Sequence, residues 1–276
     1  MGGLTRNTTA EVNSSTNPND PRRHHPRLLQ TSTTANTYYG PGSVPPSVFY
    51  VNWNYTNATY VTSVKNQGAC GSCWAFAGIA EIESYYLYKH KLYLDLSEQM
   101  MVDCLPTIQP SNLGCGGGYL DSVGIYAVRY PITTERMYPY NAVQSTCNSV
   151  RTGTGSYQIN NYIFISDCNT LANTLLNLKP IGVCMVIDQQ WQTYVSGVIP
   201  ACNQALLGGH CVLVVGAASD GTATVATNYW IIKNSWGSAF GENGFMRLYR
   251  NSTDLTNGFC GMCTSAIYSQ WSSPKS

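Results

Sequence analysis

The chain has 276 residues, a net charge of +1 at pH 7 and charged side chains at only 11% of its positions. That length is enough to bury a sizeable core in one large or two small domains. No block of lysines and arginines is longer than Arg22-Arg23, and no run of 18 apolar residues occurs. We therefore expect neither a nucleic-acid partner nor a membrane span.

The 11 cysteines are many for a reducing compartment, and their odd number predicts disulfide pairs plus one free thiol. Cys70 and Cys73 have a zinc-like spacing, but they lead into a helix and not a zinc knuckle, so we expect no metal site. Met1 to Leu4 lead directly into polar sequence, and we expect no signal peptide here. Glycosylation sequons compatible with a secretory route occur at Asn7, Asn13, Asn54, Asn57 and Asn251.

The pattern along the chain changes from helical to extended. Residues 1–43 are rich in Thr, Asn, Ser and Pro and should form an unstructured or extended tail. After a bend at Gly68–Gly71, a helix is predicted from Cys73 to about Leu87, and Ser97 is a candidate N-cap for a second helix. Later apolar runs predict strands at 159–165, 181–187, 212–215, 229–232 and 245–249, with one helix near 170–178.

An α-rich half, at about 60–158, followed by a β-rich half, at about 159–276, predicts an α+β fold of two packed subdomains. Substrates most often bind in the cleft at such an interface. A nucleophile from the first half would there meet a proton acceptor from the second.

Cys73 is the candidate nucleophile because it begins the predicted helix. Unpaired backbone N–H groups and partial positive charge gather at a helix start and favour a thiolate, so we expect a lowered pKa for this thiol. Gln67 lies six positions earlier, and its side-chain amide could help to stabilise an oxyanion. The alternative for Gln67 is a solvated turn residue.

A catalytic thiol needs a proton acceptor, and the chain has four histidines. His24 and His25 lie in the polar tail, and His90 follows the predicted helix as an ordinary C-terminal cation. His210 enters an apolar run 137 positions after Cys73. A histidine at the end of a strand can also be structural, and that alternative stands for His210 when it is considered by itself.

The segment Gln67-Gly68-Ala69-Cys70-Gly71-Ser72-Cys73-Trp74-Ala75-Phe76 resembles the nucleophile segment of the papain-like cysteine proteases. The resemblance extends over about 44–276 and implies a papain-like two-subdomain fold, with an α-helical lobe, a β-barrel-like lobe and the active-site cleft between them. It implies that 1–43 is a tail or a prosegment remnant and that 44–276 is the peptidase domain. Other segments in the family's order are Leu96-Ser97-Glu98-Gln99, Val102-Asp103-Cys104, Gly114-Cys115-Gly116-Gly117-Gly118, Tyr138-Pro139-Tyr140, Gly209-His210 and Lys233-Asn234-Ser235-Trp236-Gly237.

By this resemblance Cys73 attacks a peptide carbonyl, His210 transfers the proton, Asn234 orients the imidazole, and Gln67 stabilises the oxyanion. The substrate-binding positions it implies are Gly71, Gly117, Gly118, Tyr119, Leu120, Cys184, Gly209, Cys211, Trp236 and Ser265. Because Ser265 supplies no carboxylate, we expect a preference for an apolar side chain two residues before the cut. The link from Cys104 to Cys115 contains no histidine, which favours endopeptidase activity over dipeptide trimming.

The resemblance also implies three disulfides, Cys70–Cys115, Cys104–Cys147 and Cys202–Cys260. It suggests no pairing for Cys168, Cys184, Cys211 and Cys263, which form either two more bridges or buried thiols.

For partners, the resemblance implies protein or peptide substrates, cystatin-like or prosegment inhibitors, no cofactor, and a monomer in a lysosome, in a vacuole or outside the cell. Two alternatives are a papain-like scaffold without turnover and an acyl transferase such as a transglutaminase.

Overall fold

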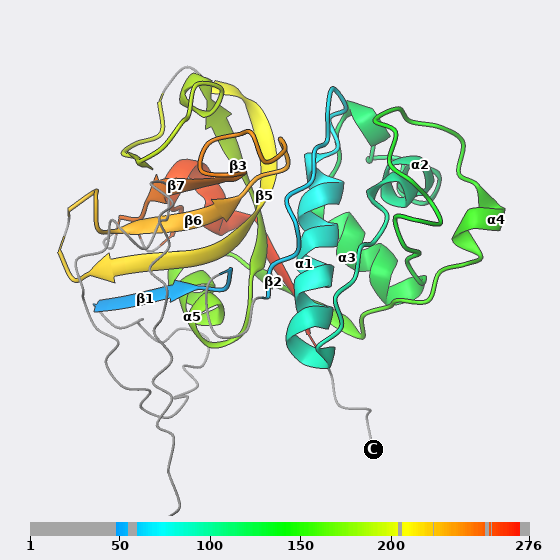
Figure 1. The fold of residues 1–276 in the computed structure, drawn as a ribbon, viewed down its shortest axis with the longest axis horizontal. Helices are drawn as coiled ribbons and strands as arrows, with labels where there is room; N and C mark the ends of the chain where they lie inside the picture. The colour runs from blue at the N-terminus through cyan, green and yellow to red at the C-terminus, as the bar shows by residue number, and fades with distance from the viewer. Residues whose placement is uncertain are drawn as a thin grey trace, which may run out of the picture. The chain divides into compact units, whose positions relative to one another are not determined.

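The computed structural model describes residues 48–54, 60–203, 206–222, 224–251, 254 and 256–270 (Figure 1). The predicted tail at 1–43 lies outside the described residues, as do His24, His25 and the sequons at Asn7, Asn13 and Asn57. The described residues all fall within one compact unit.

Helices make up the regular structure of the first half. Helix α1 (Cys73–His90) runs beyond the predicted end at Leu87, and it ends where Lys91 takes a left-handed conformation with φ of 56°. Ser97 caps α2 (Glu98–Ile108) by accepting the backbone N–H of Met100 at 3.0 Å, as its sequence predicts. A third helix that the sequence did not predict, α3 (Leu120–Arg129), packs against α1. Two short turns complete this half, η2 (Gly114–Gly116) and α4 (Ser149–Thr152).

The second half supplies seven strands of an eight-stranded sheet, and a strand from the start of the described chain supplies the eighth. The strands are β1 (Val48–Asn52), β2 (Asn161–Ile165), β3 (Ile181–Asp188), β4 (Val198–Ile199), β5 (Leu206–Asp220), β6 (Tyr229–Lys233), β7 (Phe245–Tyr249) and β8 (Ala266–Gln270). Seven of them follow the order β2-β8-β3-β5-β6-β7-β4, β1 pairs with β5, and every pair is antiparallel except β4 with β7. The helix predicted near 170–178 is α5 (Cys168–Asn177), and the short turns are η3 (Gln189–Trp191) and η4 (Phe259–Thr264).

The α+β class is confirmed, but the β-rich lobe is not a barrel, because β2 and β4 at the two ends of the order do not pair with each other. Strand β5 is the longest at 15 residues. It pairs with β6 along one edge and shares its other edge between β3 and β1. The β-rich half therefore receives a strand from before residue 60, which the division into consecutive halves did not predict.

Helix α1 lies between the two sets of elements (Figure 1). It contacts α2 and α3 as well as β3, β5 and β8. Its residues from Trp74 to Tyr85 are all buried, so this stretch of the helix has no solvent-facing side, and its polar residues Glu81, Glu83 and Ser84 are buried with the apolar ones. The residue that begins this helix, Cys73, is thereby held against the start of β5.

Five disulfides link the chain, and all 11 cysteines lie in the part of it that is described. Three are the pairs that the resemblance implies, Cys70–Cys115, Cys104–Cys147 and Cys202–Cys260. The cysteines whose pairing was open form Cys168–Cys263 and Cys184–Cys211. Only Cys73 is left as a free thiol. None of the helices in the described ranges is long and apolar enough to cross a membrane.

Candidate active site

The loop before α1 holds Cys73 in place through its disulfide. Cys70 is bonded to Cys115, and the Gly71 N–H donates to the Cys115 carbonyl at 2.9 Å. A side chain at Gly71 would place its Cβ 2.7 Å from that carbonyl oxygen, so only glycine allows this approach. Trp74, the next residue of the helix, is fully buried and donates to the Gly114 carbonyl at 3.2 Å.

The Cys73 sulfur lies among backbone donors. Burial raises the pKa of the Cys73 thiol, and hydrogen bonds from the backbone N–H groups of Cys211, Trp74 and Cys73 itself lower it. Burial is the larger effect, so the expectation of a lowered thiol pKa is wrong for Cys73 taken alone. The helix start does supply N–H donors, as predicted, but the packing around the sulfur outweighs them.

His210 and Asn234 form a hydrogen-bonded pair at adjacent strands. His210 lies on β5, Asn234 directly follows β6, and the His210 Nε2 to Asn234 Oδ1 distance is 2.9 Å. The Ser235 backbone N–H also donates to Asn234 Oδ1, at 2.8 Å. An N–H can only donate, so this contact fixes which end of the amide is the oxygen. His210 must then donate from Nε2, which leaves Nδ1 as its proton acceptor.

Two tryptophans enclose the imidazole. The Trp236 ring lies 5.0 Å from the His210 ring, and the Trp191 ring meets it edge-on at 5.6 Å. Burial lowers the pKa of His210 to about 4, against a smaller opposite effect of the Asn234 hydrogen bond. Trp236 was singled out from its motif, whereas Trp191, in η3, follows no motif used above and was missed.

Gln67 is buried and tied to both halves of the chain. Its Nε2 donates to the Cys70 carbonyl at 2.9 Å, and its Oε1 accepts from Ser235 Oγ at 2.7 Å. Its own carbonyl accepts from the Tyr140 hydroxyl at 2.8 Å. Gln67 is therefore not a solvated turn residue, and one of its two amide hydrogens has no protein acceptor among the described contacts. Ser235 and Tyr140 stand in segments that the sequence marked, but their part in holding Gln67 was not predicted.

The expected substrate-binding positions divide into open and enclosed ones. Gly117 and Gly209 have no atom within 4 Å of where a Cβ would stand, and 60% of Tyr119 is exposed. A Cβ at Gly118 would stand 2.2 Å from Asn112 Oδ1 and 2.6 Å from the Trp74 ring, so interior packing by itself requires this glycine.

The remaining positions are more enclosed. Leu120 is buried, and its methyl groups lie 3.4 Å from the Cβ position of Gly182 on β3. Cys184 and Cys211 are joined as a disulfide, and the Ser265 carbonyl accepts the Cys184 N–H at 2.8 Å. Ser265 itself is half-buried.

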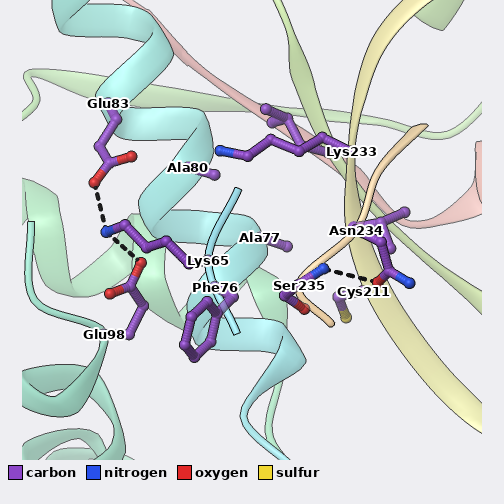
Figure 2. A pocket seen from close by; sticks show the side chains of 12 residues that line it. Lys65, Phe76, Ala77, Ala80, Glu83, Glu98, Cys211, Lys233, Asn234 and Ser235 are labelled. Atoms are coloured by element: carbon purple, nitrogen blue, oxygen red, sulfur yellow. Dashed lines mark hydrogen bonds and ion pairs between the residues drawn. The ribbon is translucent and has the colours of Figure 1, made fainter. Parts of the chain in front are cut away.

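A charged pocket between α1 and the sheet is lined by Lys65, Glu83, Glu98 and Lys233 as well as by apolar residues. Figure 2 shows Lys65 between Glu83 and Glu98, with Lys233 and Asn234 on the opposite side of the pocket. Lys65 Nζ lies 2.9 Å from Glu83 and 2.8 Å from Glu98. These ion pairs were not predicted, because their residues come from three separate segments, the loop before α1, α1 and α2.

Residues 48–270 match the family model described as papain family cysteine protease. The chain therefore belongs to the papain family of cysteine proteases, and the resemblance seen in its motifs is confirmed.

Individual relatives agree with this placement. The chain is 38% identical over 232 residues to vignain from Vigna mungo, covering 82% of this chain and 60% of vignain. It is 33% identical to a cathepsin L-like proteinase of Fasciola hepatica, covering 78% of this chain and 63% of that protein. The chain thus spans about 60% of the length of such relatives.

Solved structures show the same fold. The bromelain protease from Ananas comosus, in complex with the E64 inhibitor, aligns with a TM-score of 0.69 and 32% identity over 83% of this chain and 100% of that one. The proform of the ragweed pollen cysteine protease Amb a 11 aligns with a TM-score of 0.71 and 28% identity, covering 84% of this chain and 69% of that one.

Proposed function

We propose that this chain is a cysteine-type endopeptidase that hydrolyses peptide bonds through Cys73 and His210. The observation that carries this proposal is the free Cys73 thiol, which accepts the N–H of Cys211, the residue after His210. The His210 imidazole is hydrogen-bonded through Nε2 to Asn234. A nucleophile, a proton acceptor and an orienting group on separate elements form the arrangement that acyl transfer requires.

The proposed reaction begins when the Cys73 proton passes to Nδ1 of His210 and the sulfur attacks the substrate carbonyl. The imidazolium then protonates the leaving amine, and water hydrolyses the acyl-enzyme with His210 as the base. Asn234 keeps Nε2 protonated throughout. The Cys73 N–H and the spare amide hydrogen of Gln67 would donate to the tetrahedral oxyanion.

Burial opposes charge on each member of the pair, since it raises the pKa of Cys73 and lowers the pKa of His210. The attraction between a thiolate and an imidazolium exists only when both are charged. We therefore propose that the two groups titrate together as one unit and that the ion pair forms by proton transfer inside the site.

For specificity, we propose a preference for an apolar side chain two residues before the cut. Leu120, Cys184 and Cys211 offer apolar or sulfur-containing walls, and Ser265 introduces no charge. Gly117 offers open backbone with which an extended peptide could pair.

The five disulfides support an oxidising setting, namely a lysosome, a vacuole or the extracellular space. We also propose that cystatin-like or prosegment inhibitors would block the cleft that holds Cys73 and His210. The protein would act as a monomer and would need no cofactor.

Reaction with the inhibitor E64, followed by mass spectrometry and peptide mapping, tests the nucleophile. We expect one adduct, on Cys73, and much slower labelling of a His210→Ala variant. If the His210→Ala variant is labelled as fast as the wild type, or if folded wild-type protein is not labelled at all, the scaffold without turnover is favoured.

Paired peptides with leucine or arginine two residues before the cut then test specificity, and faster turnover of the arginine series would defeat that part of the proposal. Hydrolysis without added amine or calcium separates a protease from a transglutaminase.

A further inference from the structure

A cross-strand disulfide lies next to the catalytic histidine. In the register of β3 and β5, Cys184 is opposite Cys211 and Met185 is opposite His210. The Cys184–Cys211 bond joins these neighbouring positions, with Cα atoms 4.0 Å apart. Cys211 is buried, and both Cys184 and Cys73 pack against the apolar cluster to which it belongs.

The register decides where the Cys211 N–H points. The Cys184 N–H donates to the Ser265 carbonyl on the side away from β5, so Cys184 and Cys211 form a non-hydrogen-bonded pair of the antiparallel ladder. The Cys211 N–H must then also point away from β3. On that edge of β5, pairing with β6 begins only at Leu213 opposite Lys233. The Cys211 N–H is thus unused by the sheet, and its acceptor is the Cys73 sulfur.

The backbone of β5 near His210 and Cys211 has few other features that fix its register. The register of β3 and β5 shifts between Ile187 and Asp188, and that of β5 and β6 shifts between Val214 and Gly216. Gly208, with φ of +149°, and Gly209 directly precede His210, and neither position is crowded. A one-residue slip of a strand turns every side chain to the opposite face, so this short segment needs a fixed point.

We propose that the Cys184–Cys211 disulfide positions the nucleophile by locking β5 in the register that directs the Cys211 N–H at Cys73 and the His210 ring at Asn234. The proposal rests on the proposed function. Cys184 and Cys211 are then positioning residues: the bridge acts through the strand and does not itself touch the reacting atoms.

The test compares two variants that each lack one disulfide, Cys184→Ala/Cys211→Ala and, as the matched control, Cys202→Ala/Cys260→Ala. In both, Cys73 remains the only free thiol, so its alkylation by iodoacetamide can be followed against pH. We expect the half-maximal rate of the first variant to move up by about one pH unit, because a hydrogen bond to a charged group favours that state roughly tenfold. The control should keep the wild-type profile, and kcat for peptides should fall about tenfold in the first variant only.

Iodoacetamide needs neither the side-chain pocket nor peptide hydrolysis, so the alkylation profile remains informative if the proposed activity fails. An unchanged profile in a folded Cys184→Ala/Cys211→Ala protein would overturn the proposal, as would an equal shift in the control. If the double alanine variant does not fold, Cys184→Val/Cys211→Val keeps apolar volume at both strand positions, and the same criteria apply.

Discussion

The first turn of α1 and its middle turns meet the sheet in different ways. At the first turn, Cys73 lies among uncharged donors, and its proposed partner His210 is held by the neutral amide of Asn234. Two turns later the same helix buries Glu81 and Glu83 completely, and each carboxylate has a lysine partner.

Both buried carboxylates of the middle turns are paired with a lysine and accept further hydrogen bonds. Glu81 pairs with the buried Lys179 and accepts from the Ser269 N–H at 2.7 Å and the Ser269 hydroxyl at 2.5 Å. Glu83 accepts from Lys65, from the Thr62 hydroxyl at 2.5 Å and from the Leu96 N–H at 2.9 Å. Buried charges persist only when they are paired and hydrogen-bonded.

The two parts of α1 thus have different tasks, proton exchange at the first turn and anchoring of the helix at the middle turns. Fixed charges near Cys73 would hold its proton in one place, whereas uncharged donors leave the thiol and imidazole free to exchange it. The buried ion pairs tie α1 to the elements on either side, so the position of its first turn is set by residues that take no part in the chemistry.

The largest effect is expected at the first turn. Cys73→Ala should lower kcat by about 10⁶-fold, the loss seen when a protease nucleophile is removed. Its free energy of unfolding should change by less than about 1 kcal/mol, because one partly buried sulfur is lost. Peptide hydrolysis and urea unfolding measure the two quantities. Residual hydrolysis above about 1% of wild type would place the nucleophile elsewhere.

The next largest effect is expected in the middle turns, on stability. Glu81→Leu leaves the Lys179 ammonium without its partner and should cost about 3–5 kcal/mol of unfolding free energy. Adding Lys179→Met should recover most of that loss, because no buried charge then remains. In folded protein the alkylation rate of Cys73 should stay at its wild-type value. If Glu81→Leu slowed alkylation tenfold without unfolding the chain, the separation of tasks would be wrong.

A smaller effect is expected for Asn234→Ala. His210 would lose the acceptor for Nε2–H, and its proton could move to Nδ1, the atom that must accept from Cys73. We expect kcat to fall about 10- to 100-fold, part of the roughly 10²- to 10⁴-fold that a positioned acid–base group contributes. Asn234→Asp keeps an acceptor at the same place and serves as the control. Equal losses in both variants would show that the hydrogen bond does not set the tautomer.

The smallest effect concerns pH. Burial raises the pKa of Glu98, whose Oε2 has no hydrogen-bond partner in the structure. Above the ordinary glutamate pKa of about 4.3 the folded state then binds more protons than the unfolded state, so this group's contribution to stability declines as pH rises. Glu98→Gln should remove that dependence and raise the unfolding free energy at pH 8 by about 1 kcal/mol relative to pH 5.

Asp95→Asn is the control for Glu98→Gln, since Asp95 also pairs with Lys65 but is 59% exposed. A screened surface pair of this kind contributes about 0–1 kcal/mol. Urea unfolding at the two pH values provides the comparison, and a Glu98→Gln protein with the wild-type pH slope would contradict the assignment.

Much of the fold followed from local pattern. Apolar runs marked β3, β6 and β7 nearly to the residue, because these strands are mostly buried and most of their side chains are apolar. Helix α3 was missed since its sequence contains Gly124 and few strong helix formers, and packing against α1 stabilises it instead. Strand β1 was missed because its partner, the far end of β5, is distant in the sequence.

The site was less predictable than the fold. Motif resemblance singled out Cys73, His210 and Asn234, but the placement of Trp191 and the pairing of Cys184 with Cys211 depend on strand register, which no short segment encodes. The direction of the Cys73 pKa shift depends on how tightly two halves of the chain enclose the sulfur. Strand register, disulfide pairing and pKa shifts of this kind depend on how distant segments pack together, so the local sequence does not predict them.

The pairing of β1 with β5 fixes the position of Val48, the first residue that the structure describes. Val48 lies opposite Asp220, at the end of β5 remote from His210. Asp220 comes ten positions after His210, which corresponds to roughly 33 Å measured along the strand. A segment ahead of Val48 that inhibited its own active site would thus need about ten extended residues to reach the nucleophile. This number is the minimum length of such a connection.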